Sequence, residues 1–145
     1  MKIAVGADHG GFELKQRLAH GLARQGHEVL DCGTDSTKSV DYPDYAAAVA
    51  AAVAEGRAER GLLVCGTGIG MSIGANRVPG VRAAKCNDPF EARMARAHND
   101  ANVLCLGARV IDASVAEELL ALFLSTPFDG GRHEARVAKL DPGSC

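Results

Sequence analysis

The chain has 145 residues, 47% of them hydrophobic and 23% charged, a balance typical of one globular domain large enough to bury a core. The net charge of -2 disfavours nucleic acid or an anionic membrane as the main partner, and no apolar run approaches the ~20 residues of a membrane-spanning helix. The five cysteines are widely spaced and form no C-x-x-C pair, which favours a reducing cytoplasm over a disulfide framework or a zinc site.

Strand-like and helix-like segments alternate along the chain. Short apolar runs predict strands at Lys2–Ala7, Glu28–Leu30, Gly61–Val64, Val81–Lys85 and Val103–Leu106. Apolar residues at helical spacing, with glycine or proline near the ends, predict helices at Phe12–Gln25, Pro43–Gly56, Met71–Asn76, Pro89–Ala97, Ser114–Leu124 and His133–Leu140. This alternation predicts a Rossmann-like α/β fold, a three-layer αβα sandwich with a five-stranded parallel sheet, as a single domain over residues 1–145.

Polar residues directly follow the first and third predicted strands. In open parallel sheets, ligands bind beyond the carboxyl ends of the strands, at the point where the strand order reverses. With a strand order of 2-1-3-4-5, the first and third strands flank that point. We therefore expect Asp8, His9 and Cys65 to converge on one crevice.

The third strand leads into a glycine-rich loop, in which Gly66, Gly68 and Gly70 closely follow Cys65. Glycines let the backbone turn sharply and approach a ligand closely. The N–H groups at the start of the next helix can hold an anion or an oxyanion, and the same position favours the thiolate form of Cys65. This segment predicts an enzyme with a base or nucleophile beside an anion cradle.

Three familiar phosphate-binding motifs do not fit this loop. The dinucleotide fingerprint G-x-G-x-x-G would need glycine at position 71 or 73, where the chain has Met71 and Ile73. A cysteine phosphatase loop would need arginine at position 71 to clamp the phosphate, and no P-loop lysine follows the glycines. The loop is therefore a cradle of another kind.

Five short motifs run in order along the chain between Lys2 and about Val137. They are Val5-Gly6-Ala7-Asp8-His9-Gly10-Gly11, Asp41-Tyr42-Pro43, Cys65-Gly66-Thr67-Gly68-Ile69-Gly70, His98-Asn99-Asp100 and Gly130-Gly131-Arg132-His133-x-x-Arg136. Together they resemble the B-type ribose-5-phosphate isomerase family, which includes allose-6-phosphate and galactose-6-phosphate isomerases. The resemblance implies isomerisation of ribose 5-phosphate and ribulose 5-phosphate through an enediolate, without a metal or organic cofactor.

The resemblance also implies catalytic roles. Cys65 matches the family's catalytic base. Part of the family has a glutamate base at the position of Met71, and methionine cannot accept that proton, so this chain would depend on Cys65. His98 matches the group that assists ring opening, as an imidazole titrating near neutrality can do; an ordinary helix-end histidine is the alternative. Thr67 would relay a hydroxyl proton.

The remaining matches imply a substrate-binding surface. The enediolate oxygens would be held by Asn99 and by the backbone N–H groups of Gly66, Gly68, Ile69 and Gly70. Asp8 and His9 match a pair that contacts the sugar, and Asp8 would also suit a helix cap. Tyr42 would line the pocket or pack as an ordinary aromatic side chain.

The phosphate anchor implied by the resemblance consists of Arg109, Arg132 and Arg136, because guanidinium forks match phosphate oxygens. Arg132 and Arg136 are four residues apart and would share one face of a helix, although a solvated basic helix would show the same spacing.

Family members are homodimers, often paired into tetramers, with active sites shared between two subunits. The apolar helices Tyr45–Val53 and Val115–Leu124 would suit such contacts. We expect the groups near Cys65 to come from one subunit, and His98 with the arginines from its partner. Two alternatives stay open: a hexose 6-phosphate such as allose 6-phosphate as the substrate, and a non-catalytic sugar-phosphate sensor.

Overall fold

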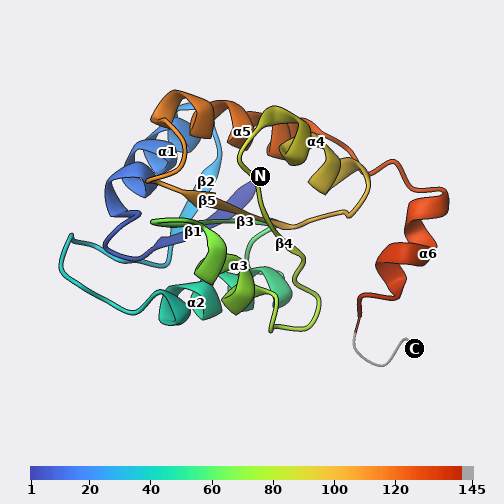
Figure 1. Ribbon diagram of the computed structural model, residues 1–145, viewed down its shortest axis with the longest axis horizontal. Coiled ribbons are helices and arrows are strands. Elements are labelled where there is room, and N and C mark those ends of the chain that lie inside the picture. The colour runs from blue at the N-terminus through green and yellow to red at the C-terminus, as the bar shows by residue number, and fades with distance from the viewer. Residues whose placement is uncertain (142–145) are drawn as a thin grey trace.

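A five-stranded parallel sheet between two layers of helices forms the body of the molecule in the computed structural model, which describes residues 1–141 (Figure 1). The strands are β1 (Lys2–Ala7), β2 (Glu28–Asp31), β3 (Arg60–Cys65), β4 (Ala83–Lys85) and β5 (Val103–Gly107). The helices are α1 (Phe12–Arg24), α2 (Tyr42–Ala54), α3 (Ile69–Ala75), α4 (Pro89–Ala97), α5 (Ala113–Ser125) and α6 (Arg132–Ala138). The predicted three-layer αβα architecture is confirmed.

The strand order is β2-β1-β3-β5-β4, so the expected order 2-1-3-4-5 is wrong at one edge. All five residues of β5 are buried, and the strand lies inside the sheet beside β3. By contrast β4 has only three half-buried residues and ends in Lys85, which suits an edge strand. The reversal point between β1 and β3 is the same in both orders, because β2 lies on one side of this pair and both later strands on the other.

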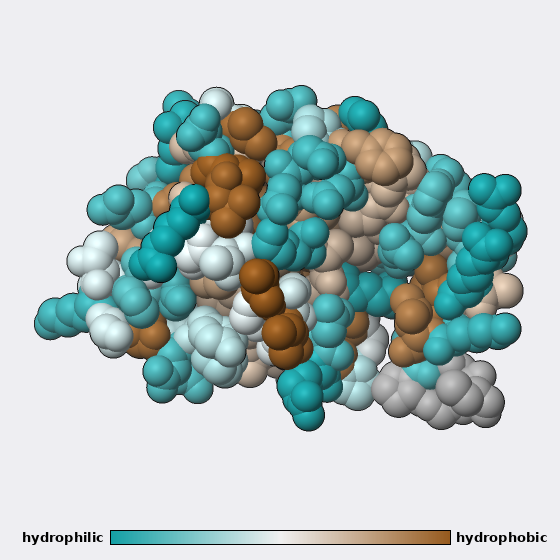
Figure 2. Space-filling model, in the orientation of Figure 1, coloured by the Kyte–Doolittle hydropathy of each residue, from teal (hydrophilic) through white to brown (hydrophobic). Residues whose placement is uncertain are grey.

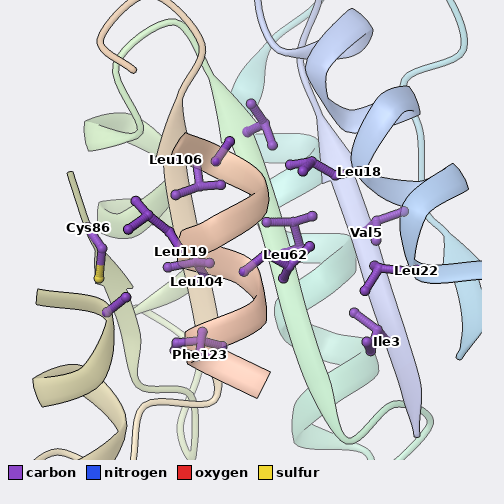
Figure 3. Close-up of a cluster of buried hydrophobic side chains, with 14 of the residues drawn as sticks. Ile3, Val5, Leu18, Leu22, Leu62, Cys86, Leu104, Leu106, Leu119 and Phe123 are labelled. Carbon is purple, nitrogen blue, oxygen red and sulfur yellow. The ribbon is translucent and has the colours of Figure 1, made fainter. Parts of the chain in front are cut away.

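Two apolar cores fill the space between the sheet and its helices. On one face, side chains of β1, β3 and β5 such as Val5, Leu62 and Leu104 pack against α1, α4 and α5 (Figure 3). On the other face, Leu63 and Val103 pack against α2 and α3. Successive residues of a strand point to opposite faces, so the continuous apolar runs in the sequence are those of strands covered on both sides.

A fully buried lysine ties α1 to the long loop between β2 and α2. The Lys15 ammonium donates to both carboxylate oxygens of Asp31, at 2.7 and 2.9 Å, and to the carbonyl oxygen of Thr34 at 2.8 Å. Burial of a charge is tolerated when it is paired and hydrogen-bonded, as here. The loop that leads to Tyr42 is thereby attached to the helix that follows Asp8.

Helix α6 lies apart from the three layers, at the right of Figure 1, and makes few contacts with them. Its visible surface is largely hydrophilic in Figure 2. No helix in the described part of the chain has the length and apolar character needed to cross a membrane.

Candidate active site

The first group of candidate residues lies at the carboxyl edge of the sheet and is called here the cysteine group: Asp8, His9, Tyr42, Cys65–Gly70 and Arg109. Cys65 is the last residue of β3 and is only 5% exposed. The backbone N–H of Gly68 donates to its Sγ atom across 3.1 Å. The sulfur therefore lies at the turn that leads into the N-terminus of α3.

The loop after Cys65 depends on a glycine at position 68. Gly68 has a φ of 79°, a left-handed conformation that other residues adopt at a cost, and it directly precedes α3. Thr67 Oγ1 accepts a hydrogen bond from the N–H of Ile69 at 3.2 Å, so its hydroxyl is oriented beside the same turn. Met71 is fully buried in the core, which leaves Cys65 as the ionisable side chain at this end of β3.

Arg109 belongs to the cysteine group because the β5–α5 loop is attached to the loop after β3. The N–H groups of Ala108 and Arg109 donate to the carbonyl oxygens of Cys65 and Gly66, at 2.8 and 3.0 Å. A Cβ atom on Gly66 would lie 3.1 Å from Nη1 of Arg109, so the guanidinium covers this glycine. A guanidinium therefore lies over the backbone of the cradle.

Asp8, His9 and Tyr42 approach the same edge from other loops. One carboxylate oxygen of the buried Asp8 accepts from the N–H groups of Gly10 and Gly11, at 2.9 and 3.1 Å. His9 Nδ1 accepts from the N–H of Val40 at 3.2 Å, which attaches the loop before α2. The Tyr42 ring covers Gly70, where a Cβ atom would lie 2.6 Å from the ring.

The second group lies near the amino edge of the sheet and is called the histidine group: His98, Asn99, Arg132, His133 and Arg136. The His98 and His133 rings stack with their centroids 4.2 Å apart and their planes 12° apart. A pocket of about 280 Å³ is lined by His98, Asn99, His133, Arg136, Val137 and Leu140. Burial and the positive charges of His98, Arg132 and Arg136 lower the pKa of His133.

Two unusual turns shape the histidine group. Asp100 has a φ of 46°, and its carboxylate binds Arg96 at 2.8 Å and Arg82 at 3.1 Å, which holds the turn after Asn99. Gly130 and Gly131 have φ angles of 66° and 56°, and this turn brings α6 back so that His133 reaches His98.

The two groups lie at opposite edges of the sheet within one chain. Gly61 pairs with Val103 at the amino end of β3 and β5, and Cys65 pairs with Gly107 at the carboxyl end. These pairs are four residue steps apart, about 13 Å along the strands. His98 precedes β5 on the amino side, so Cys65 and His98 of one chain do not face one pocket. Arg109 is separated from Arg132 and Arg136 in the same way, which corrects the expectation that all three arginines accompany His98.

The other described cysteines differ from Cys65 in their surroundings. Cys86, directly after β4, and Cys105, within β5, are almost fully buried. Burial, with the nearby carboxylates of Glu91 and Asp88, raises the pKa of Cys86 to about 12, and burial raises the pKa of Cys105 as well. Neither thiol is suited to act as a base near neutral pH. Cys145 lies outside the described residues.

With this geometry in place, comparisons with known proteins define the class of the chain. Residues 3–140 match the Ribose/Galactose Isomerase family model. The chain is 47% identical to ribose-5-phosphate isomerase B of Escherichia coli over 136 residues, which cover 94% of this chain and 91% of the relative. The chain belongs to the ribose/galactose isomerase family.

Solved structures show the same fold. The ribose-5-phosphate isomerase B structure from Clostridium thermocellum matches with a TM-score of 0.96 and 51% identity, covering 97% of this chain and 95% of that one. The Thermotoga maritima ribose 5-phosphate isomerase structure matches with a TM-score of 0.95 and 54% identity, covering 97% of each chain.

Sequence reasoning did not single out Asp129, which the structure places beside His98 with a separation of 3.9 Å between the carboxylate Oδ2 and Nε2. The only signal in the sequence was its position directly before the Gly130-Gly131 pair. The backbone N–H of Asp129 donates to the carbonyl oxygen of Ala97 at 2.9 Å, a contact between distant segments that local patterns cannot reveal.

Proposed function

We propose that this chain interconverts ribose 5-phosphate and ribulose 5-phosphate. The proposal is supported by family membership, by the identity to ribose-5-phosphate isomerase B of Escherichia coli, and by one feature of the site above all. That feature is the Cys65 sulfur at the N-terminal end of α3, 3.1 Å from the N–H of Gly68 and beside the glycine cradle.

In the proposed mechanism the Cys65 thiolate removes the C2 proton of open-chain ribose 5-phosphate and returns it to C1 of the enediolate. The enediolate oxygens are stabilised by backbone N–H groups of the Gly66–Gly70 segment, which forms the entry to α3. Thr67 transfers the hydroxyl proton between O2 and O1. Asp8 and Tyr42 position the sugar.

His98 opens the furanose ring by taking the proton of the anomeric hydroxyl and giving it to the ring oxygen as the bond between C1 and that oxygen breaks. Asn99 follows it in the chain and binds an enediolate oxygen. Arg132 and Arg136 hold the phosphate through charge-assisted hydrogen bonds, and Arg109 approaches it from the cysteine group. His9, beside Asp8, contacts the sugar phosphate from the same side as Arg109.

A complete site requires a second copy of the chain, since the cysteine and histidine groups lie at opposite edges of the sheet. The proposed assembly is a homodimer, with pairing into a tetramer left to solution measurements. The large exposed apolar side chains in or next to the cysteine group include Tyr42, Ile69, Ile73 and Val110, at 41%, 52%, 58% and 49% exposure. The helices Tyr45–Val53 and Val115–Leu124 bury much of their apolar surface against the sheet instead.

Mixed dimers test the shared site. Cys65→Ala and His98→Ala subunits, each inactive alone, are coexpressed with different affinity tags, and the doubly tagged dimers are isolated. Each isolated mixed dimer has one site with both Cys65 and His98 intact and one site with neither, so it is expected to recover about half of the wild-type activity. Absence of recovery in purified mixed dimers would contradict sharing.

Substrate identity is tested by turnover of ribose 5-phosphate, with allose 6-phosphate in parallel and a chelator present. Activity on ribose 5-phosphate supports the proposal, and activity on the hexose phosphate alone keeps the mechanism but changes the substrate. Binding of both sugars without turnover would favour the sensor alternative. The proposed location is the cytoplasm, consistent with the unpaired cysteines of the described chain, Cys32, Cys65, Cys86 and Cys105.

A further inference from the structure

Three side chains that commonly bind metals gather in the histidine group and at the turn before it. One ligand atom each from His98, Asp129 and His133 lies within 4.8 Å of the other two. In a tetrahedral site, bonds of about 2.0–2.2 Å to zinc place ligand atoms roughly 3.3–3.6 Å apart, so the exposed Asp129 side chain must rotate toward the two imidazoles to complete the set. The nitrogen lone pairs of the stacked imidazoles lie in nearly parallel ring planes, so the rings must rotate out of the stack for both to bind one ion.

Backbone contacts bring the three residues together before any ion binds. The Asp129 N–H is hydrogen-bonded to the carbonyl oxygen of Ala97 at 2.9 Å, so Asp129 lies next to the residue that precedes His98. His133 is only 8% exposed, and the Gly130-Gly131 turn fixes its position on His98. Segments more than 30 residues apart in the sequence thus meet at one point.

The donor set selects the kind of ion. Two imidazole nitrogens and one carboxylate oxygen suit zinc, cobalt or nickel, whereas magnesium and calcium prefer oxygen ligands alone. Arg132 and Arg136 lie close to His133 and oppose any cation. The positive charges of these arginines act most strongly against ions that are held by charge alone. Ions that form directed bonds to nitrogen, such as zinc, are therefore favoured.

We propose that His98, Asp129 and His133 bind a zinc-class divalent cation, and that this ion inhibits the enzyme. The inhibitory part rests on the proposed function, since it assigns ring opening to His98; the binding part does not. An imidazole nitrogen bonded to a metal cannot exchange a proton, so an ion on His98 stops ring opening. The ion also adjoins the pocket lined by Arg136.

Binding is tested first, on the full chain without substrate. Calorimetric titration with zinc is expected to show one ion per chain, and cobalt is expected to give visible absorption without a thiolate charge-transfer band. Asp129→Asn and His133→Asn each weaken zinc binding about 10- to 100-fold or more, as loss of even an outer-sphere partner does. Glu134→Gln removes an exposed carboxylate from α6, the helix that carries His133, and leaves the zinc affinity unchanged.

Inhibition is then tested with ribose 5-phosphate, after a metal-free assay has established activity. Zinc inhibits the wild type, a chelator restores activity, and Asp129→Asn keeps its metal-free activity while requiring about 10-fold or more zinc for inhibition. A thiolate band with cobalt, or equal zinc affinity in all variants, would overturn the site. Zinc binding that leaves an active enzyme unaffected would overturn the inhibitory role. An inactive metal-free enzyme would instead refute the proposed function.

Discussion

The cysteine group and the histidine group are held by different kinds of contact. The cysteine group is fixed by backbone hydrogen bonds between strand-end loops, such as Arg109 N–H to the Gly66 carbonyl oxygen. The histidine group is assembled by side chains, a ring stack and a glycine turn, on a helix with few contacts to the layers. The sheet therefore holds the cysteine group directly, while Arg132 and Arg136 lie on a helix that makes few contacts with the three layers.

The largest effect is expected at Cys65, where substitution tests the role of the cysteine group in proton transfer. Cys65→Ser should lower kcat about 10²- to 10⁴-fold, the usual contribution of a general base, while KM changes little. Cys32→Ser is the matched control, because Cys32 is a half-buried thiol outside the site, and it should keep normal turnover. Near-normal kcat in Cys65→Ser would remove the cysteine from the mechanism.

A smaller effect is expected at Arg136, which tests the phosphate-binding half. Arg136→Gln should lower kcat/KM about 10- to 100-fold, mainly through KM, because a hydrogen bond to a charged group is worth about 1.5–3 kcal/mol. Lys139→Gln removes an exposed charge at the end of the same helix and should change little. Steady-state kinetics of both variants separate a specific contact with the phosphate from attraction of the substrate by the overall positive charge of the helix. Equal losses of kcat/KM in the two variants would favour the second explanation.

Close packing at the carboxyl edge predicts an effect on stability. A Cβ atom on Gly11 would lie 2.3 Å from the carbonyl oxygen of Val64, so Gly11→Ala should destabilise the protein by about 1–3 kcal/mol, as overpacking does. Gly21, in the middle of α1, has no atom within 4 Å of such a Cβ, and Gly21→Ala should stabilise by roughly 1 kcal/mol. Urea unfolding measures the stability of both variants. Similar stabilities would show that the loop between β1 and α1 is not tightly packed.

The smallest effect is expected for the pH dependence of the free energy of unfolding, through His133 in α6. Because the pKa of His133 is lowered in the folded state, the unfolded chain binds more protons as the pH falls below about 6.5. The free energy of unfolding of the wild type should therefore decrease relative to His133→Asn between about pH 7.5 and pH 5. His20→Asn, at an exposed position, should follow the wild type. Parallel pH dependences of wild type and His133→Asn would show that the histidine contact is not formed in solution.

Much of the fold was predictable because it depends on local patterns. The apolar runs and their glycine and proline boundaries located every strand and helix to within a few residues, and the cradle after Cys65 could be recognised from its glycines. The position of Arg109 could not be predicted, since it depends on β5 lying directly beside β3. The expected order placed β4 there instead.

By itself, the sequence determined which residues follow strands and which precede them. All strands of a parallel sheet point in the same direction, so residues that follow strands lie at the carboxyl edge and residues that precede strands lie at the amino edge. Cys65, at the end of β3, and His98, before β5, therefore lie at opposite edges of the sheet. Only the tertiary structure decided that β5, buried over its whole length, lies inside the sheet, and that the Gly130-Gly131 turn brings His133 and Asp129 to His98. Both depend on contacts between distant segments, whose free energies do not appear in any local pattern of residues.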